Sequence, residues 1–135
     1  MKIVLDTNVL VSGIFFTGPP SKILRAWSRG KVQLVVTPEI LDEYRRVVIE
    51  LHDKFPGVEV GPILDLIVVN SKLCAPARLP RPICADPADD KFFAGAVASG
   101  ANTIISGDKH LLAVSGYRGI NVVSPRGFVD RYLVD

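Results

Sequence analysis

Two aspartates follow short apolar segments in a way that predicts a shared site. Asp6 comes directly after the apolar run at residues 2–5, and Asp108 comes shortly after another run at residues 103–105. In parallel α/β sheets, ligands bind beyond the carboxyl ends of the strands, where the strand order reverses. If these two strands are neighbours, both carboxylates lie on one rim of the sheet. The alternative is that each aspartate only caps the helix that follows it.

A glutamate within a helical segment is the third acid. The helix expected from Pro38 to about Lys54 has an apolar stripe centred on Ile40, Tyr44, Val47 and Leu51. At roughly 100° per residue, Glu43 lies at the border of this stripe, whereas Asp42 points away from it. Glu43 can therefore reach inward over the sheet edge. A solvated flank with Arg46 nearby fits the same position, and helix geometry alone does not decide between them.

The remaining acids are clustered in the segment DPADDK at residues 86–91. Asp86 before a proline is typical of a helix N-cap, and acids in the first turn favour the helix dipole. Two adjacent acids, Asp89 and Asp90, exceed what capping needs. Crowded near Asp6 and Asp108, they would repel one another unless a divalent cation held them.

This combination of ligand types indicates a particular chemistry. Carboxylate oxygens without histidine or cysteine select Mg²⁺ or Mn²⁺ rather than zinc. Four or five carboxylates around such ions form the apparatus of two-metal phosphodiester hydrolysis. Between the adjacent pair, Asp89 lies one turn before Phe93 on the side expected to face the sheet, whereas Asp90 is rotated outward. The first turn is loose enough that either one remains a metal ligand in this interpretation.

The elements that must position these acids alternate between strand-like and helix-like patterns. This order predicts an α/β fold with a parallel sheet, in one domain over residues 1–135. Strands are expected at residues 2–5, 32–36, 103–105 and 121–123. Helices are expected at residues 8–16, 21–29, 38–54, 61–70 and 86–99, in a short segment after Asp108, and from Pro125 onward. The proline-rich stretch at residues 75–87 predicts an extended loop.

Composition excludes several other classes of protein. The chain has 135 residues, 48% of them hydrophobic and 22% charged, and its net charge is +2. These values are ordinary for a folded domain and argue against disorder or a coiled coil. No apolar run reaches the roughly 18 residues that a membrane helix needs, and the N-terminus does not resemble a signal peptide. Cys74 and Cys84 are too few for a disulfide framework, so a reducing cytoplasm is the expected location.

Several other residues have a structural interpretation. Trp27, Phe92 and Phe93 fall at helical spacing and are expected in the core rather than stacked on bases. His110 is expected to be solvated, and the two cysteines to be ordinary buried thiols. A set of basic residues offers a path for phosphates near an acidic centre, although for each one a solvated position is favoured: Lys22, Arg25, Arg29, Arg45, Arg46, Lys91 and Lys109.

Taken in order, four segments resemble the PIN-domain family, and within it the short bacterial and archaeal toxin components of toxin–antitoxin pairs. The segments are IVLDTNVLVSGI, TPEILDEYRRV, DPADDKFFAGAVASGANTIISGD followed by KHLL, and VVSPRGFVDRYL. The resemblance spans nearly the whole chain. It implies a three-layer α/β/α domain, a metal-dependent ribonuclease active on single-stranded RNA, a cognate antitoxin protein and a homodimer.

The resemblance also implies roles for particular residues. The catalytic acids become Asp6, Glu43, Asp89 and Asp108, which with Asp90 are the expected ligands of Mg²⁺ or Mn²⁺. Asn8 and Ser106 are expected to support the site by hydrogen bonding. Serine replaces the family's usual threonine at position 106 but keeps the hydroxyl. Many relatives have asparagine where this chain has Asp90, which leaves open which member of the pair binds metal.

Three rival interpretations compete with this one. A haloacid-dehalogenase-type phosphatase needs an aspartate two residues after the first, where this chain has Asn8. A response-regulator receiver needs an aspartate that closes a middle strand, but Asp53 falls in a helical pattern. A PIN-like module that binds RNA or a protein without cutting is the alternative from another class. The presence of every acid favours the enzyme.

Overall fold

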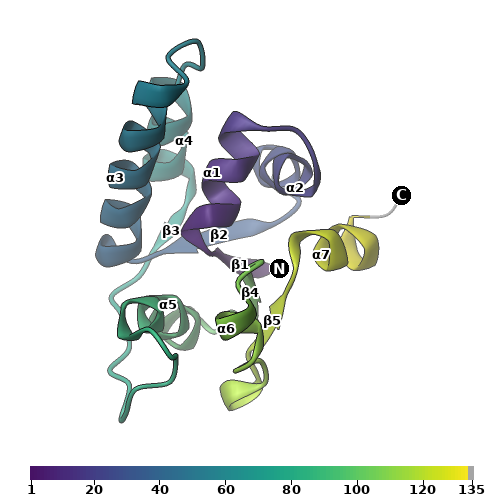
Figure 1. Ribbon diagram of the computed structural model, residues 1–135. Helices are drawn as coiled ribbons and strands as arrows, with labels where there is room; N and C mark the ends of the chain where they lie inside the picture. The colour runs from purple at the N-terminus through teal and green to yellow at the C-terminus, as the bar shows by residue number, and fades with distance from the viewer. Residues whose placement is uncertain (134–135) are drawn as a thin grey trace.

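Five short parallel strands form the centre of the fold (Figure 1). The computed structural model describes residues 1–133. The strands are β1 (Lys2–Leu5), β2 (Gln33–Val36), β3 (Lys72–Leu73), β4 (Thr103–Ile105) and β5 (Asn121–Val123), in the order β3-β2-β1-β4-β5. The chain runs outward from β1 to β3 and then crosses over to β4. The strand order therefore reverses between β1 and β4, where α/β proteins bind their ligands.

Helices cover both faces of this sheet. They are α1 (Thr7–Phe15), α2 (Pro19–Ser28), α3 (Pro38–Lys54), α4 (Gly61–Asn70), α5 (Asp90–Ser99), α6 (Lys109–Leu112) and α7 (Pro125–Tyr132). Helix α5 packs against β1, β2 and β4 on one side, while α1 and α2 lie on the other side, with α7 against α2 (Figure 1). This arrangement confirms the expected three-layer α/β fold. None of the helices within residues 1–133 is both long and apolar enough to span a bilayer.

Burial on both faces explains why the strands are continuous apolar runs. Ile3, Val4 and Leu5 are all fully buried although their side chains alternate between the two faces. Trp27, Phe92 and Phe93 are also buried, which confirms their expected place in the core. The packing of these buried side chains fixes the position of the carboxyl edge of the sheet.

The sequence did not predict β3. Both of its residues are exposed, so it has no apolar pattern that marks a strand. It is defined by pairing alone: Lys72 lies opposite Val35, Leu73 lies opposite Val36, and the Cys74 N–H donates to the Val36 carbonyl at 2.9 Å. A two-residue edge strand of this kind depends on its partner rather than on its own sequence.

Several expected helix boundaries were also wrong. Helix α2 begins at Pro19 rather than Ser21, because prolines fit the first turn, where backbone N–H groups have no helical partner. The helix expected over residues 86–99 is instead a 3₁₀ turn at Pro87–Asp89 followed by α5. In α3, Val48 is fully buried, whereas Val47 and Leu51 are only partly buried. The apolar stripe is therefore rotated slightly from its predicted centre.

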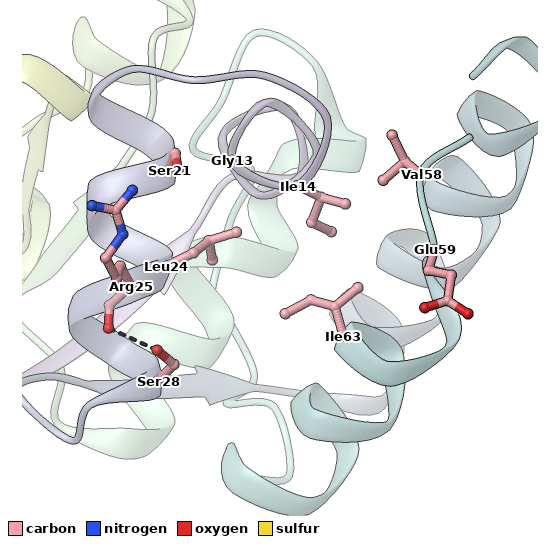
Figure 2. A pocket seen from close by; sticks show the side chains of 9 residues that line it. All are labelled: Gly13, Ile14, Ser21, Leu24, Arg25, Ser28, Val58, Glu59 and Ile63. Atoms are coloured by element: carbon pink, nitrogen blue, oxygen red, sulfur yellow. Dashed lines mark hydrogen bonds between the residues drawn. The ribbon is translucent and has the colours of Figure 1, made fainter. Parts of the chain in front are cut away.

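A close approach of α1 to α2 fixes one wall of the domain. A Cβ atom added to Gly13 would lie 2.7 Å from Leu24 Cδ1 and 2.8 Å from the Pro20 carbonyl oxygen. Figure 2 shows Gly13 facing α2, beside a hollow of about 300 Å³ that Ile14 and Ile63 also line. Because one of the two obstacles is backbone, the contact cannot be relieved by a side-chain rotation alone.

We therefore expect Gly13→Ala to lower the free energy of unfolding by about 1–3 kcal/mol, the usual cost of overpacking. Gly61→Ala is the matched control, since Gly61 lies in the first turn of α4 and nothing lies within 4 Å of its added Cβ. The control should be neutral or slightly stabilising because alanine is the better helix former. Urea unfolding of the two variants makes the comparison. Equal stability would mean that the α1–α2 contact adjusts freely.

Candidate active site

The register of β1 and β4 places Asp6 beside Ser106. Leu5 pairs with Ile105, and the Asp6 N–H donates to the Ile105 carbonyl at 3.0 Å. The Ser106 hydroxyl, which is fully buried, donates to Asp6 Oδ2 at 2.7 Å. Asp6 is itself only 6% exposed. The two strands are thus neighbours, and a buried carboxylate lies at the carboxyl edge where they end.

The environment of Asp6 opposes its ionisation. Burial raises the pKa of the Asp6 carboxyl above its ordinary value, and the charges of Asp108 and Glu43 raise it further. Hydrogen bonds from the Ser106 hydroxyl and the Asn8 backbone lower this pKa but do not cancel the effect. The Asn8 residue is exposed, and among residues 1–133 its side chain forms no hydrogen bond. Asn8 supports the Asp6 carboxylate through a hydrogen bond from its backbone.

Ser106 also fixes the start of the Asp108 segment. Its Oγ accepts a hydrogen bond from the Asp108 N–H at 3.0 Å while donating to Asp6. The Asp108 carboxylate then accepts from the His110 N–H at 2.8 Å and caps the short helix α6. Capping therefore does occur at Asp108, and it uses Oδ1. His110 is exposed, as expected.

Glu43 reaches the same edge from α3. The Tyr44 hydroxyl donates to the Leu5 carbonyl at 2.5 Å, which fastens α3 over the end of β1. The neighbouring residue, Glu43, accepts a hydrogen bond from the Thr7 hydroxyl through Oε2 and from Lys91 Nζ at 2.6 Å through Oε1. Glu43 therefore points toward the sheet edge rather than lying on a fully solvated flank.

The partners of Glu43 keep it ionised. Burial alone would raise the pKa of this carboxyl, but the hydrogen bonds from Lys91 and Thr7 outweigh burial and lower it. The Lys91 side chain is only 9% exposed, so the favoured interpretation of Lys91 as a solvated cation was wrong. Arg46 lies farther off, at 3.8 Å from the same oxygen, and is 63% exposed.

Asp89 and Asp90 have different surroundings although they are adjacent. Asp90 accepts hydrogen bonds from the backbone N–H groups of Cys84, at 2.8 Å, and Ile83, at 3.3 Å. Its carboxylate therefore closes the proline-rich loop onto α5. No such partner occurs for the Asp89 side chain among the hydrogen bonds of residues 1–133. Asp86 acts as the expected cap, accepting from the Ala88 N–H at 3.0 Å.

The charge of Asp89 is poorly compensated. Burial raises the pKa of its carboxyl to about 6, and the negative charges of Asp6, Asp86, Asp108 and Glu43 all contribute to this rise. Carboxylates from separate segments of the chain are therefore near enough to repel one another. Burial and the Asp90 carboxylate raise the pKa of the nearby Cys84 thiol to about 12, so this cysteine is no nucleophile.

The carboxylates at this edge have the chemistry to bind a divalent cation, but they are not arranged around a common point. The four in question are Asp6, Glu43, Asp89 and Asp108. Within residues 1–133 no three acidic, histidine or cysteine side chains converge as a preformed metal site. Oxygen donors with unrelieved mutual repulsion fit a hard dication. Glu43, however, already has a cation in Lys91. The residues fit a metal ion provided that Glu43 exchanges this partner for it.

Sequence reasoning did not single out Thr7, and it considered Lys91 only as a possible phosphate contact, not as the partner of Glu43. Thr7 follows Asp6 in the D-T-N triplet and is buried, but a threonine after a strand has many structural roles. Lys91 contacts a glutamate 48 positions away in the chain. No local periodicity reports such a contact, so only the fold reveals it.

The raised pKa of Asp89 leads to a prediction about stability. In the unfolded chain this carboxyl ionises near its ordinary pKa of 3.8, whereas in the folded protein it ionises at about 6. The folded state therefore binds more protons between these values, and stability must fall as the pH rises through this window. Asp89→Asn should reduce that fall, leaving the part that comes from the raised pKa of Asp6, and should make the metal-free protein more stable at pH 7. Urea unfolding in EDTA at several pH values measures it.

Asp42→Asn is the control for this experiment, because Asp42 is exposed on α3 and lies outside the acidic edge. It should leave the pH dependence unchanged. Carbon NMR of the Asp89 carboxyl provides a second reading: its pKa should drop when Asp6 is changed to Asn, since the Asp6 charge contributes to the rise. An unshifted Asp89 carboxyl would show that the acids do not interact.

Comparison with known proteins places this geometry in a family. The PIN domain family matches residues 2–110, which include every acid described above. No curated protein and no solved structure matches the chain significantly. PIN domains are in general nucleases and typically use divalent metal ions, so the family implies a nuclease-type function. With most of its length matched and a five-stranded parallel sheet of the expected kind, the chain belongs to the PIN-domain family.

Proposed function

We propose that this protein is a divalent-metal-dependent endoribonuclease that hydrolyses phosphodiester bonds of single-stranded RNA. The observation that supports it is the mutual repulsion of carboxylates at the carboxyl edge of the sheet. Burial raises the pKa of Asp89 to about 6, and the charges of Asp6, Asp86, Asp108 and Glu43 add to the rise. Of these acids, Asp6, Asp108 and Glu43 come from separate segments of the chain. A stable fold gains nothing from this repulsion, whereas a cation-binding site requires it.

Asp6, Asp89 and Asp108 would hold Mg²⁺ or Mn²⁺, with Glu43 completing the set. When bound, such ions lower the pKa of an attacking water and neutralise the charge on the leaving oxygen. The chain supplies orientation: the Ser106 hydroxyl holds Asp6 at 2.7 Å and the Asp108 backbone at 3.0 Å. Because one hydroxyl makes both contacts, the Asp6 carboxylate and the Asp108 backbone keep a fixed separation without a metal ion.

Of the two adjacent acids, we assign Asp89, in the 3₁₀ turn, rather than Asp90 as the metal ligand. The Asp90 carboxylate already accepts two backbone hydrogen bonds, from Ile83 and Cys84, and would have to abandon them to bind a cation. Asp89 has a raised pKa and no such commitment. Asp90 then acts by anchoring the proline-rich loop against α5.

Lys91 occupies the position of a cation beside Glu43 before metal binds. Its ammonium group, 2.6 Å from Oε1, competes with a divalent ion for the same carboxylate. With Glu43 as a ligand of the metal ion, Lys91 would be available to pair with a phosphate of the substrate. A charge-assisted contact from an otherwise buried lysine is stronger than one from an exposed side chain.

The biological role proposed is that of the toxin in a toxin–antitoxin pair, in the cytoplasm. It rests on the resemblance of the four sequence segments to such toxins. A small antitoxin protein would be the cognate partner and a homodimer the functional form. A neighbouring reading frame that encodes a small antitoxin-like protein would support this role, and copurification of the two proteins would test it.

The competing proposal is a PIN-like module that binds RNA or protein without cutting it. The observation in its favour is the Lys91–Glu43 pair, which already neutralises one acid of the site. The two hypotheses differ in metal binding, since a non-catalytic module has no use for Mn²⁺. Metal titration and RNA cleavage assays therefore separate them.

We expect Lys91→Met to bind Mn²⁺ several-fold more tightly than the unmodified protein, because it removes the cation that competes for Glu43. Arg46→Met is the matched control: Arg46 approaches the same Glu43 oxygen, but at 3.8 Å and with 63% of its side chain exposed. Its effect should be small, as for most exposed ion pairs. Isothermal titration with MnCl₂ measures both. Equal affinities in the two variants would mean that Glu43 is not a ligand.

Purified protein should cleave single-stranded RNA with Mg²⁺ or Mn²⁺ and stop in EDTA. Asp6→Asn and Asp89→Asn should each reduce single-turnover cleavage at least about a hundredfold, because each removes a charge but little volume. Asp90→Asn should keep at least about a tenth of the activity, a loss below roughly 1.4 kcal/mol of transition-state stabilisation. Circular dichroism confirms folding. Cleavage that persists in EDTA would refute the metal mechanism, and an inactive Asp90→Asn beside an active Asp89→Asn would reverse the assignment.

A further inference from the structure

A basic hollow lies between α2 and α7. It has a volume of about 260 Å³, and its walls include Lys22, Arg25, Arg29, Lys31, Val129 and Leu133. Four of these side chains are cationic, and no acidic residue lines the hollow. Its floor is aliphatic. A concave surface with cations around its rim is suited to an anionic ligand.

Helix geometry gathers these cations on one side. At roughly 100° per residue, Lys22, Arg25 and Arg29 fall within an arc of about 60° on α2 and its C-cap. The opposite side of α2 carries buried residues, among them Ile23 and Trp27. Lys31 follows in the next turn, where its backbone N–H donates to the Ala26 carbonyl at 2.9 Å. The backbone therefore places the four basic residues on one side of the molecule, whatever rotamers their side chains adopt.

The cations of this hollow are not neutralised by the described chain. Both ion pairs found within residues 1–133 involve Glu43, so none of the four has an acidic partner there. All four residues are exposed. The net charge of the whole chain is only +2, so this concentration of positive charge is local. Like charges crowded without counter-charges are relieved by a bound anion.

The hollow is separate from the acidic edge. Lys31 leads into β2, and the Gln33 N–H at the start of that strand donates to the Met1 carbonyl at 2.8 Å. This part of α2 therefore lies toward the amino edge of the sheet, whereas Asp6 and Ser106 lie at the carboxyl edge. The four residues of β1 alone extend over roughly 13 Å. A ligand that reaches both regions must be a long polyanion rather than a mononucleotide.

We propose that the α2–α7 hollow binds backbone phosphates of the RNA strand whose scissile bond lies at the acidic edge. This inference rests on the proposed ribonuclease function and adds a second anchoring point for the same substrate. Contacts to phosphates are independent of sequence and fix the register of the strand. The hollow thus makes long single strands better ligands than short ones. It takes no part in the chemical step.

The test measures RNA binding without cleavage. In an Asp6→Asn background, Lys22, Arg25 and Arg29 are all changed to Gln, and binding of a labelled single-stranded 20-mer is followed by fluorescence anisotropy. We expect the affinity to fall at least about 30-fold. The slope of log K against log salt should become shallower by about 2, because three phosphate contacts on a single strand are lost. Thermal unfolding should be unchanged, since the three side chains are exposed.

The control variant changes three exposed cations elsewhere, Lys54, Lys72 and Arg118, to Gln, and so alters the net charge equally. It should keep the affinity within about threefold. Equal losses in both variants would overturn the proposal in favour of general charge attraction. So would an unchanged RNA affinity accompanied by lost binding to phosphatidylserine vesicles, which would assign the hollow to a membrane surface.

A second arm separates this proposal from the proposed function. In the background with Asp6 intact, the hollow variant should cleave a 5-mer at the unmodified rate but a subsaturating 20-mer at least about tenfold more slowly. Absence of cleavage in every variant, with the difference in RNA binding retained, would refute the nuclease function and leave the binding site standing. A difference in 5-mer cleavage would overturn the proposal, because it would place the hollow in the catalytic machinery.

Discussion

The repulsion among carboxylates at the carboxyl edge of the sheet is the constraint on which the rest of the site depends. The register of β1 with β4 brings Asp6 next to Ser106 and only two residues from Asp108. Because the carboxyl ends of both strands are fully buried, the backbone from which these side chains extend is held in place. Burial raises the pKa values of Asp6 and Asp89, and the charges of neighbouring acids raise them further. Burial without compensation costs free energy, and the apolar core must offset it.

The acids differ in the partner that each has for its negative charge, and these differences indicate a different role for each acid. Glu43 has Lys91 as a counter-ion, and Asp108 directs Oδ1 to a backbone N–H. Asp90 is fully engaged by the loop that it closes. Asp89 alone among them combines a raised pKa with no hydrogen-bonding partner of its own in the described chain. A free divalent ion would gain most from the acid whose charge is least compensated.

The sequence predicted those parts of the fold and the site that local patterns report. Strands β1 and β4 are apolar runs with an acid after each, so the amino-acid pattern alone locates Asp6 and Asp108 at strand ends. Strand β3 has no such pattern, because Lys72 and Leu73 form it only by pairing with β2. The 3₁₀ turn before α5 was missed for a similar reason. Helix propensity over residues 86–99 is continuous, and the break follows from the hydrogen bonds that bind Asp90 to the proline-rich loop.

Contacts between distant segments were the least accessible to sequence reasoning. The helical position of Glu43 was compatible with both a solvated flank and an inward orientation. The hydrogen bond from the Tyr44 hydroxyl to the Leu5 carbonyl decides between these two orientations, because it fixes α3 to the end of β1. Lys91 illustrates the same limit: its sequence neighbours are acids, yet its partner is Glu43 on another helix. A charged residue in an acidic segment is ambiguous until the fold assigns it a counter-charge.

The two charged regions complement each other across the sheet. Acids gather where the strands end, and the cations of the α2–α7 hollow gather toward the side where they begin. Under the proposed function, the acidic edge repels an RNA strand unless metal ions neutralise it, so affinity for RNA would have to come from elsewhere on the surface. Helix α2 is suited to that task because its inner side, with Ile23 and Trp27, is fixed in the core while its outer side is free to carry charge. If the hollow binds the substrate as proposed, attraction and chemistry occur in separate places, and the site can keep its carboxylates close together without losing a polyanionic substrate.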